Sequence, residues 1–212
     1  MDGTKMYYHL IYWGISRVNV LSRRTISLGV CAYCFFMSLN ILLLAADENE
    51  ARLVETKLKA AFLVKLPQFI EWPQTAFKSK SETFRLGLVP NDAFTDFIMN
   101  DIEKQTCGGR GFQIVKTTKI EELQECHIVF VSKNAENLIP QILKSINDRP
   151  ILTVGDGENF AHKGLIINFK KTSESKLRFE YNLQAARSAN LKISAKFLQV
   201  SSPASTNNPG NK

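Results

Sequence analysis

Short β-rich runs alternate with helical stretches between residues 84 and 154, and this alternation restricts the fold more than any other feature of the chain. The β-rich runs are FRLGLV (84–89), GFQIVKT (111–117), HIVFVS (127–132) and PILTVG (150–155). Helices are predicted from Ala93 to Glu103, after a Pro-Asn-Asp turn, and from Asn134 to Ile146, with Asn134 as the candidate cap. Such alternation predicts an α/β sheet with helices on both faces.

The flanking segments extend this sheet. From Glu50 to Ile70 apolar residues recur at spacings of three and four, which predicts an amphipathic helix that Pro67 ends or kinks. GLIINFK (164–170) and KLRFEYN (176–182) predict a β-hairpin that joins the sheet antiparallel. A short helix is expected after it, and the type of the last segment before residue 200 stays open. We therefore expect an α/β fold in a single domain, with a mixed, mostly parallel sheet flanked by helices and a C-terminal β-hairpin.

The N-terminus has the layout of an export signal. Basic residues up to Arg24 precede an uncharged run from Thr25 to Ala46, which ends in two alanines before an acidic stretch. We expect residues 1–46 to be a cleaved signal peptide, 47–200 the α/β domain and 201–212 a disordered tail. The run also has the roughly 20 residues that span a bilayer, so retention as a membrane anchor is the alternative. Either way, the bulk of the protein leaves the cytoplasm.

Charge and motifs argue against a nucleic-acid or nucleotide ligand. Losing residues 1–46 removes four basic residues and one acidic residue, so the net charge of +7 falls to +4. Basic residues do not form a stripe with interleaved aromatic residues, as nucleic-acid binding would favour. The chain also lacks the Gly-rich patterns GxGxxG and GxxxxGK[ST], which hold phosphates in α/β sheets.

The cysteines divide between the leader and the domain. Cys31 and Cys34 lie inside the apolar run, which leaves Cys107 and Cys126 as an even pair in an oxidising compartment. A structural disulfide between them is the natural prediction, and closing this loop would stabilise the fold by about 3 kcal/mol. A reactive thiol is the alternative, although nothing near either cysteine resembles a catalytic arrangement.

Two groups of polar residues are candidates for chemistry. Asp156, Glu158 and His162 lie in a Gly-rich loop, but their spacing matches no zinc or calcium pattern. A surface connection in which Asp156 caps the turn is favoured over a metal site. His127 precedes a buried strand, and a satisfied edge histidine is favoured over a ligand or base because no serine or acid completes a triad.

Four blocks of the sequence, in order, resemble the YfiR family of exported bacterial proteins. They are KAAFLVKLPQFIEWP (59–73), ECHIVFVS (125–132), ILTVGDGENFAHKGLIINF (151–169) and LRFEYNLQAARSANLKISAKFLQV (177–200). Cys126 falls at the family's cysteine position. The signature positions hold the following residues in this chain: Phe69, Trp72, Pro73, His127, Asp156, Phe160, Gly164, Asn168, Phe169, Arg178, Phe179 and Asn182.

This resemblance implies a periplasmic regulatory protein without catalytic activity, cofactor or metal. The implied partner is the periplasmic domain of an inner-membrane signalling protein, either a YfiN-type diguanylate cyclase or a sensor kinase. Binding would repress the cyclase, lower cyclic di-GMP and disfavour biofilm. A homodimer is a further partner to consider. The alternative function is a periplasmic small-ligand-binding module with its pocket at the carboxyl ends of the parallel strands. A hydrolase ranks below both because no nucleophile-base constellation is present.

Alternating residues in the last predicted strand point to opposite faces of the sheet. Arg178, Glu180 and Asn182 share one face, and the apolar residues between them share the other. A solvated face with a cross-strand ion pair is slightly favoured over a docking surface.

Overall fold

The computed structural model describes residues 50, 53–89, 101–116, 119–172 and 176–204. The chain divides into two compact units, Met1–Val54 and Glu55–Lys212, and the account below concerns the second. The predicted leader, most of the predicted helix from Ala93 to Glu103 and residues 205–212 of the predicted tail lie outside the described residues. Within the described ranges, no helix combines the length and the apolar character needed to cross a membrane.

The predicted first helix is present and ends as its proline requires. It covers residues 53–65 and passes into η1 (Leu66–Phe69), a 3-10 turn with Pro67 near its start. Proline lacks the N–H that an α-helix would bond at this point, so the helix cannot continue. The elements that follow up to the first long strand are β1 (Ile70–Glu71), η2 (Gln74–Ala76) and β2 (Phe84–Val89).

The middle of the chain supplies the centre of the sheet. Its elements are β3 (Thr106–Cys107), β4 (Arg110–Lys116), η3 (Ile120–Glu125), β5 (Ile128–Val131), η4 (Lys133–Leu138), α3 (Ile139–Ser145) and β6 (Leu152–Gly155). Ser132, and not the predicted Asn134, is the N-cap of η4, because its hydroxyl accepts a hydrogen bond from the backbone N–H of Asn134 at 3.2 Å.

The C-terminal part contains the predicted hairpin and more strands than predicted. Its elements are β7 (Ile167–Lys171), β8 (Leu177–Tyr181), α4 (Leu183–Ser188), β9 (Lys192–Ile193), α5 (Ala195–Val200) and β10 (Ser202–Pro203). β10 pairs with β8, and the N–H of Ala204 donates to the carbonyl of Tyr181. The first residues of the expected tail therefore pair with the sheet.

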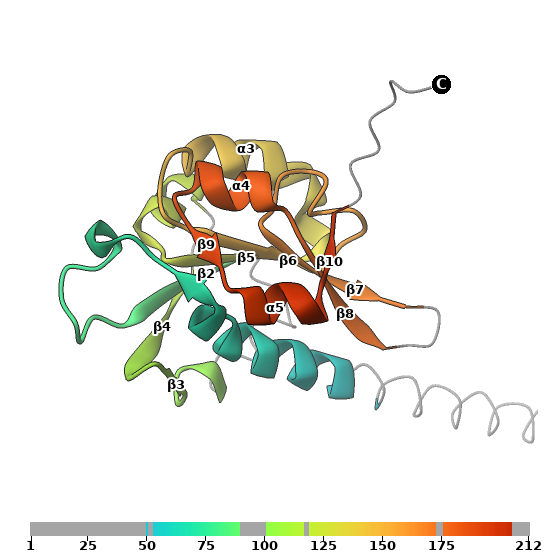
Figure 1. Ribbon diagram of the computed structural model, residues 1–212, viewed down its shortest axis with the longest axis horizontal. Coiled ribbons are helices and arrows are strands. Elements are labelled where there is room, and N and C mark those ends of the chain that lie inside the picture. The colour runs from blue at the N-terminus through green and yellow to red at the C-terminus, as the bar shows by residue number, and fades with distance from the viewer. Residues whose placement is uncertain (1–49, 51–52, 90–100, 117–118, 173–175, 205–212) are drawn as a thin grey trace, which may run out of the picture. The chain divides into compact units, whose positions relative to one another are not determined.

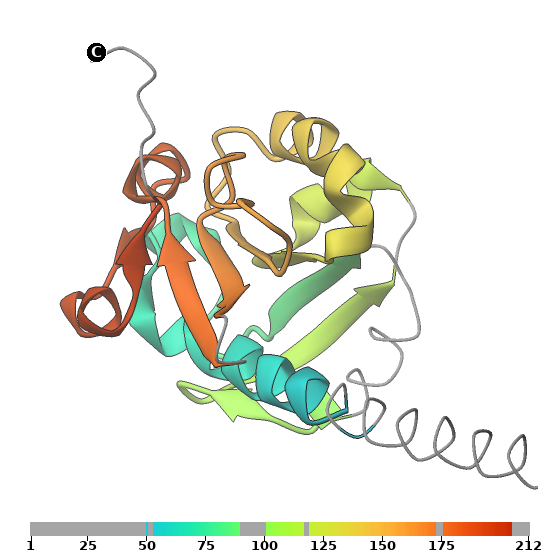
Figure 2. The ribbon, with the colours of Figure 1, turned by 90° about the vertical axis from the view of Figure 1, so that its right-hand side faces the viewer.

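The main sheet is mixed and mostly parallel, as the sequence predicts. Its strand order is β10-β8-β7-β6-β5-β2-β4-β3, with antiparallel pairs only at β7/β8 and β3/β4 among the described strands. The five strands from β4 to β7 follow the doubly wound order 2-1-3-4-5 when they are numbered along the chain. Figure 2 shows the orange hairpin strands on one side and the green β2 and β4 on the other. A separate two-stranded sheet pairs β1 with β9.

Two hydrophobic clusters cover opposite faces of this sheet. The first core cluster includes Leu63 of the N-terminal helix, Phe130 and Phe197, and the second includes Val129 and Ile142. Because adjacent residues of a strand point to opposite faces, Val129 and Phe130 of β5 belong to different clusters. Figure 1 accordingly shows α3 on one side of the sheet, and the teal N-terminal helix and α5 on the other.

Candidate functional site: an ion-pair network at the strand ends

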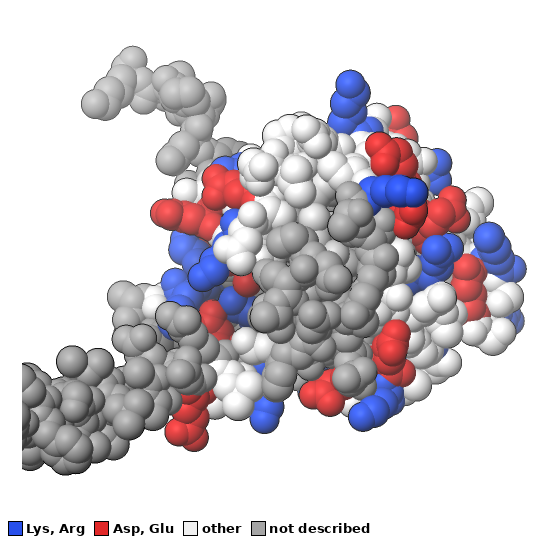
Figure 3. All heavy atoms as spheres, turned by 180° about the vertical axis from the view of Figure 1, so that it is seen from behind, with Lys and Arg blue, Asp and Glu red and all other residues white. Residues whose placement is uncertain are grey.

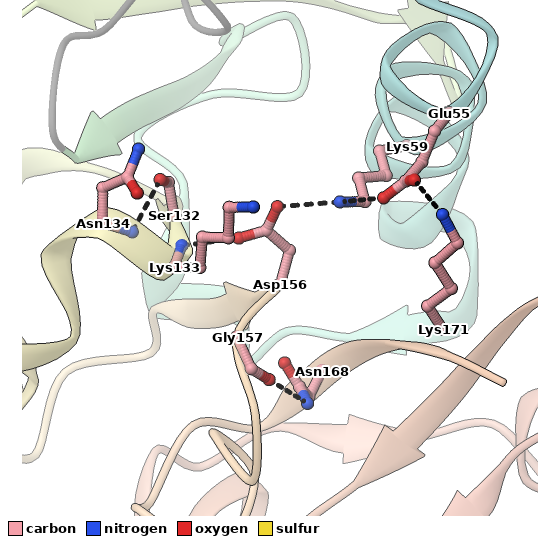
Figure 4. Close-up of polar contacts among 9 residues, drawn as sticks. All are labelled: Glu55, Lys59, Ser132, Lys133, Asn134, Asp156, Gly157, Asn168 and Lys171. Carbon is pink, nitrogen blue, oxygen red and sulfur yellow. Dashed lines mark hydrogen bonds and ion pairs between the residues drawn. The ribbon is translucent and has the colours of Figure 1, made fainter. Parts of the chain in front are cut away.

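Asp156 lies where two parallel strands end. Val131 of β5 is paired with Gly155 of β6, so the residues that follow these strands are neighbours. One carboxylate oxygen of Asp156 accepts a hydrogen bond from the backbone N–H of Lys133 at 2.7 Å. The other lies 2.9 Å from Nζ of Lys59 on the N-terminal helix (Figure 4). Asp156 therefore joins both strand ends to a helix, and the predicted role as a local turn cap is wrong.

Lys59 connects Asp156 to a second carboxylate. Its Nζ lies 2.8 Å from Glu55 Oε1, one helical turn earlier, and Glu55 Oε2 lies 3.0 Å from Nζ of Lys171 at the end of β7. We call Glu55, Lys59, Asp156 and Lys171 the ion-pair network (Figure 4). The side chains of Lys59 and Asp156 are only 12% and 7% exposed, so their charges are largely removed from water.

The network favours the ionised forms of Lys59 and Glu55. Burial disfavours the ammonium of Lys59, but the charges of Asp156 and Glu55 outweigh burial, and the pKa of Lys59 is raised. Burial also disfavours the carboxylate of Glu55, yet hydrogen bonds from Lys59 and Lys171 leave its pKa lowered. A lysine that stays protonated between two carboxylates is a poor nucleophile and a poor base. The ion-pair network therefore connects the N-terminal helix to β7 and to the end of β6, and Lys59 is not poised to act as a nucleophile or base.

The loop after Asp156 is closed around a buried phenylalanine. Phe160 is fully buried in the second core cluster. A Cβ atom at Gly155 would lie 2.6 Å from the Phe160 ring, and one at Gly157 would lie 2.2 Å from it. Gly164 has a φ of +106°, which favours glycine, and it lies against the side chain of Leu143. Glycine at these three positions therefore lets the backbone pack directly against Phe160 and α3.

Two asparagines hold the same loop from the hairpin side. The amide of Asn168 donates to the carbonyl of Gly157 at 3.0 Å (Figure 4), and the amide of Asn182 donates to the carbonyl of Ala161 at 2.8 Å. Asn182 also caps α4 by accepting from the N–H of Ala185. Both residues thus bond the backbone, as buried polar groups usually do.

The structure does not bring Asp156, Glu158 and His162 together. Asp156 points toward Lys59 and Lys133, while the side chains of Glu158 and His162 are exposed. Among the residues with described positions, no group of three His, Cys, Asp or Glu side chains is arranged to hold a metal ion.

His127 is the satisfied histidine that the sequence favours. It is 6% exposed, and both ring nitrogens lie within hydrogen-bond distance of backbone groups. Its ring stacks on Phe77 at 4.4 Å between centroids.

Phe69, Trp72 and Pro73 form the aromatic corner before β2. Phe69 lies 5.8 Å from Phe197, and Trp72 lies 5.4 Å from Phe84, between ring centroids. Pro73 precedes η2 and accepts a hydrogen bond from the N–H of Ala76. Beside this corner is a cavity of about 580 Å³, which Trp72 and Phe77 help to line.

The predicted disulfide between Cys107 and Cys126 is absent, and both thiols are free. Cys107 packs against the first core cluster, whereas Cys126 belongs to the second, so the sheet lies between them. The prediction rested on the even number of cysteines in the domain, and that number does not show on which face of the sheet each side chain lies. Burial raises the pKa of Cys107 and raises that of Cys126 to about 11, so Cys126 is a protonated, unreactive thiol.

The hairpin residues divide between the core and the opposite face. Phe169 and Phe179 are buried 5.5 Å apart in the first core cluster, and Arg178 is exposed. Glu180 differs from the expected solvated position: it is 7% exposed and pairs with Lys170 at 2.8 Å. The predicted cross-strand ion pair is therefore present, but one of its two partners is buried.

Sequence reasoning missed Lys59, the central member of the network. One signal was available: Lys59 lies four residues after Glu55 and four before the buried Leu63, which puts it on the inner side of a helix. Nothing in the nearby sequence indicates that Lys133 contacts Asp156 or that Lys171 contacts Glu55, because these contacts depend on how the strands pair.

Comparison with known families supports the resemblance that the sequence suggested. A family model described as YfiR/HmsC-like matches residues 56–202. This range contains Lys59, Asp156, Lys171 and the described strands from β1 to β9, and it ends at the first residue of β10. A search of curated proteins finds no match.

Proposed function

Because this chain belongs to the YfiR/HmsC-like family, we propose that it is a non-catalytic regulatory protein of the periplasm. In this proposal it binds the sensor region of an inner-membrane signalling protein and represses it. The signalling protein is a diguanylate cyclase, so repression lowers cyclic di-GMP. The observation that carries the proposal is the family match, which spans residues 56–202 and thus the main sheet up to the first residue of β10.

The contacts of the reactive side chains agree with a non-catalytic role. Both ring nitrogens of His127 face backbone groups, and Lys59 is shared between two carboxylates. The thiol of Cys126 is buried and protonated. Each of these groups is already engaged within the fold, whereas a catalytic nucleophile or base needs access to a substrate.

The leader supports export. Its basic flank, uncharged run and terminal alanines match a signal peptide that is cleaved after residue 46, and retention as an anchor would keep the domain at the same membrane. On the face seen in Figure 3, basic and acidic side chains are interspersed, which fits a protein partner better than a polyanion.

Repression sets a thermodynamic requirement for the partner. A repressor shifts a sensor toward its inactive state only by binding that state more tightly than the active one. Moving the sensor from mostly active to mostly inactive requires a difference of about 5.5 kcal/mol in binding free energy.

The test is genetic and biochemical. Deleting the gene should raise cellular cyclic di-GMP, and expressing the exported protein from a plasmid should restore the lower level. The same deletion in a strain that lacks the membrane diguanylate cyclase proposed as the partner should change nothing. The purified protein should also retain the separately expressed periplasmic region of that cyclase. Unchanged cyclic di-GMP after deletion would refute the proposal.

A small-ligand-binding module is the second candidate, favoured by the aromatic cavity beside Trp72. This cavity lies away from the carboxyl ends of β5 and β6, where Asp156, Lys133 and Lys59 are in contact. Mass spectrometry of small molecules released when the purified protein is denatured would test this function.

A further inference from the structure

A hollow of about 290 Å³ lies between α3 and α4. Leu143 of α3 and Ile146, the residue that ends this helix, line one side. Ala185 of α4 and Ala189, at its end, line the other side. Figure 2 shows the orange loop before β7 between the two helices, and Gly164 of this loop also lines the hollow. Alanine and glycine have too few side-chain atoms to reach across such a space, so these short residues leave the hollow open.

The inner surface of the hollow is aliphatic. Ile146, Ile151 and Ile166 line it and are only 6%, 3% and 2% exposed. Its described lining contains no aromatic side chain, in contrast to the cavity beside Trp72 and Phe77. Aliphatic walls favour any apolar ligand that leaves water, but they offer no ring face on which an aromatic ligand would stack. The walls therefore favour an aliphatic ligand.

One polar group lies within this aliphatic lining, the hydroxyl of Thr153. Thr153 is 2% exposed, and its oxygen accepts a hydrogen bond from the backbone N–H of Ile166 at 2.9 Å. A hydroxyl also has a hydrogen to donate, and among the described residues none accepts it. A buried donor without an acceptor is unfavourable. A ligand that brings a carbonyl oxygen to Thr153 would therefore form a hydrogen bond that the fold leaves unmade.

The charged residues at the hollow already have partners. The carboxylate of Asp148 accepts a hydrogen bond from the amide of Asn147 at 2.6 Å. The guanidinium of Arg149 donates to the backbone carbonyl and the side-chain oxygen of Gln124, at 3.3 Å and 3.0 Å. These two charges are also opposite in sign, so they do not favour ions of either sign. An ionised ligand would lose its hydration without meeting an unpaired opposite charge, and the hollow therefore favours an uncharged ligand.

The volume of the hollow limits the size of the ligand. Because a water molecule occupies about 30 Å³ in the liquid, the hollow corresponds to about ten waters. It is thus close to the lower end of the range of ligand pockets, about 300 Å³. A compound of about ten non-hydrogen atoms has a suitable size.

We propose that the hollow between α3 and α4 binds a small uncharged aliphatic carbonyl compound, such as a ketone or an ester. The carbonyl oxygen of the ligand accepts the hydrogen of Thr153, and its hydrocarbon chain packs against Ile146, Ile151 and Ile166. This site is separate from the aromatic cavity beside Trp72. Its binding can be measured with the purified protein alone, so the outcome does not depend on the membrane partner proposed above.

Two matched probes test the proposal: methyl hexanoate, an uncharged ester, and hexanoate, the corresponding carboxylate anion. NMR of the isoleucine methyl groups reports where each probe binds. Methyl hexanoate should shift the signals of Ile146, Ile151 and Ile166 in a saturable manner, and hexanoate should bind at least about tenfold more weakly. Ile70 lines the aromatic cavity and is the internal control, so its signals should not shift. Saturable shifts at Ile70 alone, no saturable shift, or equal binding of the two probes would overturn the proposal.

Two substitutions at Thr153 test the hydrogen bond. Thr153→Val keeps the shape of the side chain but removes the hydroxyl, so it should weaken the binding of methyl hexanoate by about threefold to tenfold. Thr153→Ser keeps a hydroxyl and should bind the ester like the wild type. Undiminished binding by Thr153→Val would contradict the proposed contact.

Ala185→Leu tests the hollow itself. The larger side chain should fill the space and abolish binding of the ester. Ala195→Leu, at an exposed position of α5, is the matched control and should bind like the wild type. Thermal unfolding followed by circular dichroism verifies that each variant is folded. A folded Ala185→Leu protein that still binds methyl hexanoate would refute the site, and if this variant does not fold, the two Thr153 variants decide.

Discussion

Lys59 illustrates how one side chain can hold a helix against a sheet. Its ammonium is largely removed from water, and the carboxylates of Asp156 and Glu55 offset the cost of burying that charge. The lysine is therefore not interchangeable with an apolar residue of similar length, because its loss would leave the buried carboxylate of Asp156 without its ion-pair partner.

We expect Lys59→Met to lower the free energy of unfolding by about 3 kcal/mol, the cost of leaving one member of a buried pair without its partner. Lys57→Met, at an exposed position of the same helix, should change it by less than about 0.5 kcal/mol. Urea denaturation of both variants checks this. Equal stabilities would mean that the network contributes nothing. In Lys59→Met/Asp156→Asn the loss should be smaller than the sum of the two single losses.

The two thiols give a second prediction at the residue scale. In the purified protein at neutral pH, Cys126 should alkylate slowly because it is buried and its pKa is about 11. After denaturation without reductant, both Cys107 and Cys126 should alkylate completely, as peptide mapping would show. A peptide pair joined through these residues in protein taken from the periplasm would instead restore the disulfide that the sequence predicts.

At the scale of the elements, the loop from Asp156 to Ile166 has strict packing requirements. Phe160 fills the second core cluster from inside the loop, and the glycines leave no room for a side chain next to its ring. The segment is rich in glycine because its backbone packs directly against the ring of Phe160.

We expect Gly157→Ala to destabilise the fold by about 1–3 kcal/mol, because its Cβ would lie 2.2 Å from the Phe160 ring and force the ring to move. Gly111→Ala is the matched control, since its Cβ would meet Thr83 at an ordinary 3.6 Å. Thermal unfolding of the two variants provides the comparison. A Gly157→Ala protein as stable as Gly111→Ala would show that the loop adapts easily.

Elements with strong local patterns could be predicted from the sequence. β2 begins and ends where its apolar run does, the hairpin forms antiparallel, and the N-terminal helix stops before Pro67. Two-residue strands such as β9 and β10 could not be predicted, because only a distant partner makes them strands. The ion-pair network has the same limitation, since Lys59 and Asp156 are 97 residues apart in the chain.

At the scale of the whole molecule, the main sheet contributes side chains to both core clusters. Neighbouring residues of β5, such as Val129 and Phe130, belong to different clusters, so neither cluster can lose its packing without disturbing the strand that both share. The unit from Glu55 onward should therefore unfold as one cooperative structure.

This cooperativity predicts that Leu63→Ala, in the first cluster, and Ile142→Ala, in the second, weaken the same transition. Each substitution should lower the free energy of unfolding by about 2–5 kcal/mol. Each variant should still unfold with coincident changes in circular dichroism and in the fluorescence of Trp72. In the chain without residues 1–46, Trp72 is the single tryptophan. Two separate transitions, or a variant that shifts one probe alone, would show that the clusters unfold independently.

The pairing of β1 with β9 has a consequence for the timing of folding. Ile70 pairs with Ile193, so a growing chain waits about 6–25 s, at ordinary rates of synthesis, between making the first strand and making its partner. Parallel strands joined by long connections also form slowly. A nascent chain therefore reaches nearly full length before its N-terminal and C-terminal segments can meet. In the export that we propose, this delay leaves time for the chain to cross the membrane before β1 and β9 pair.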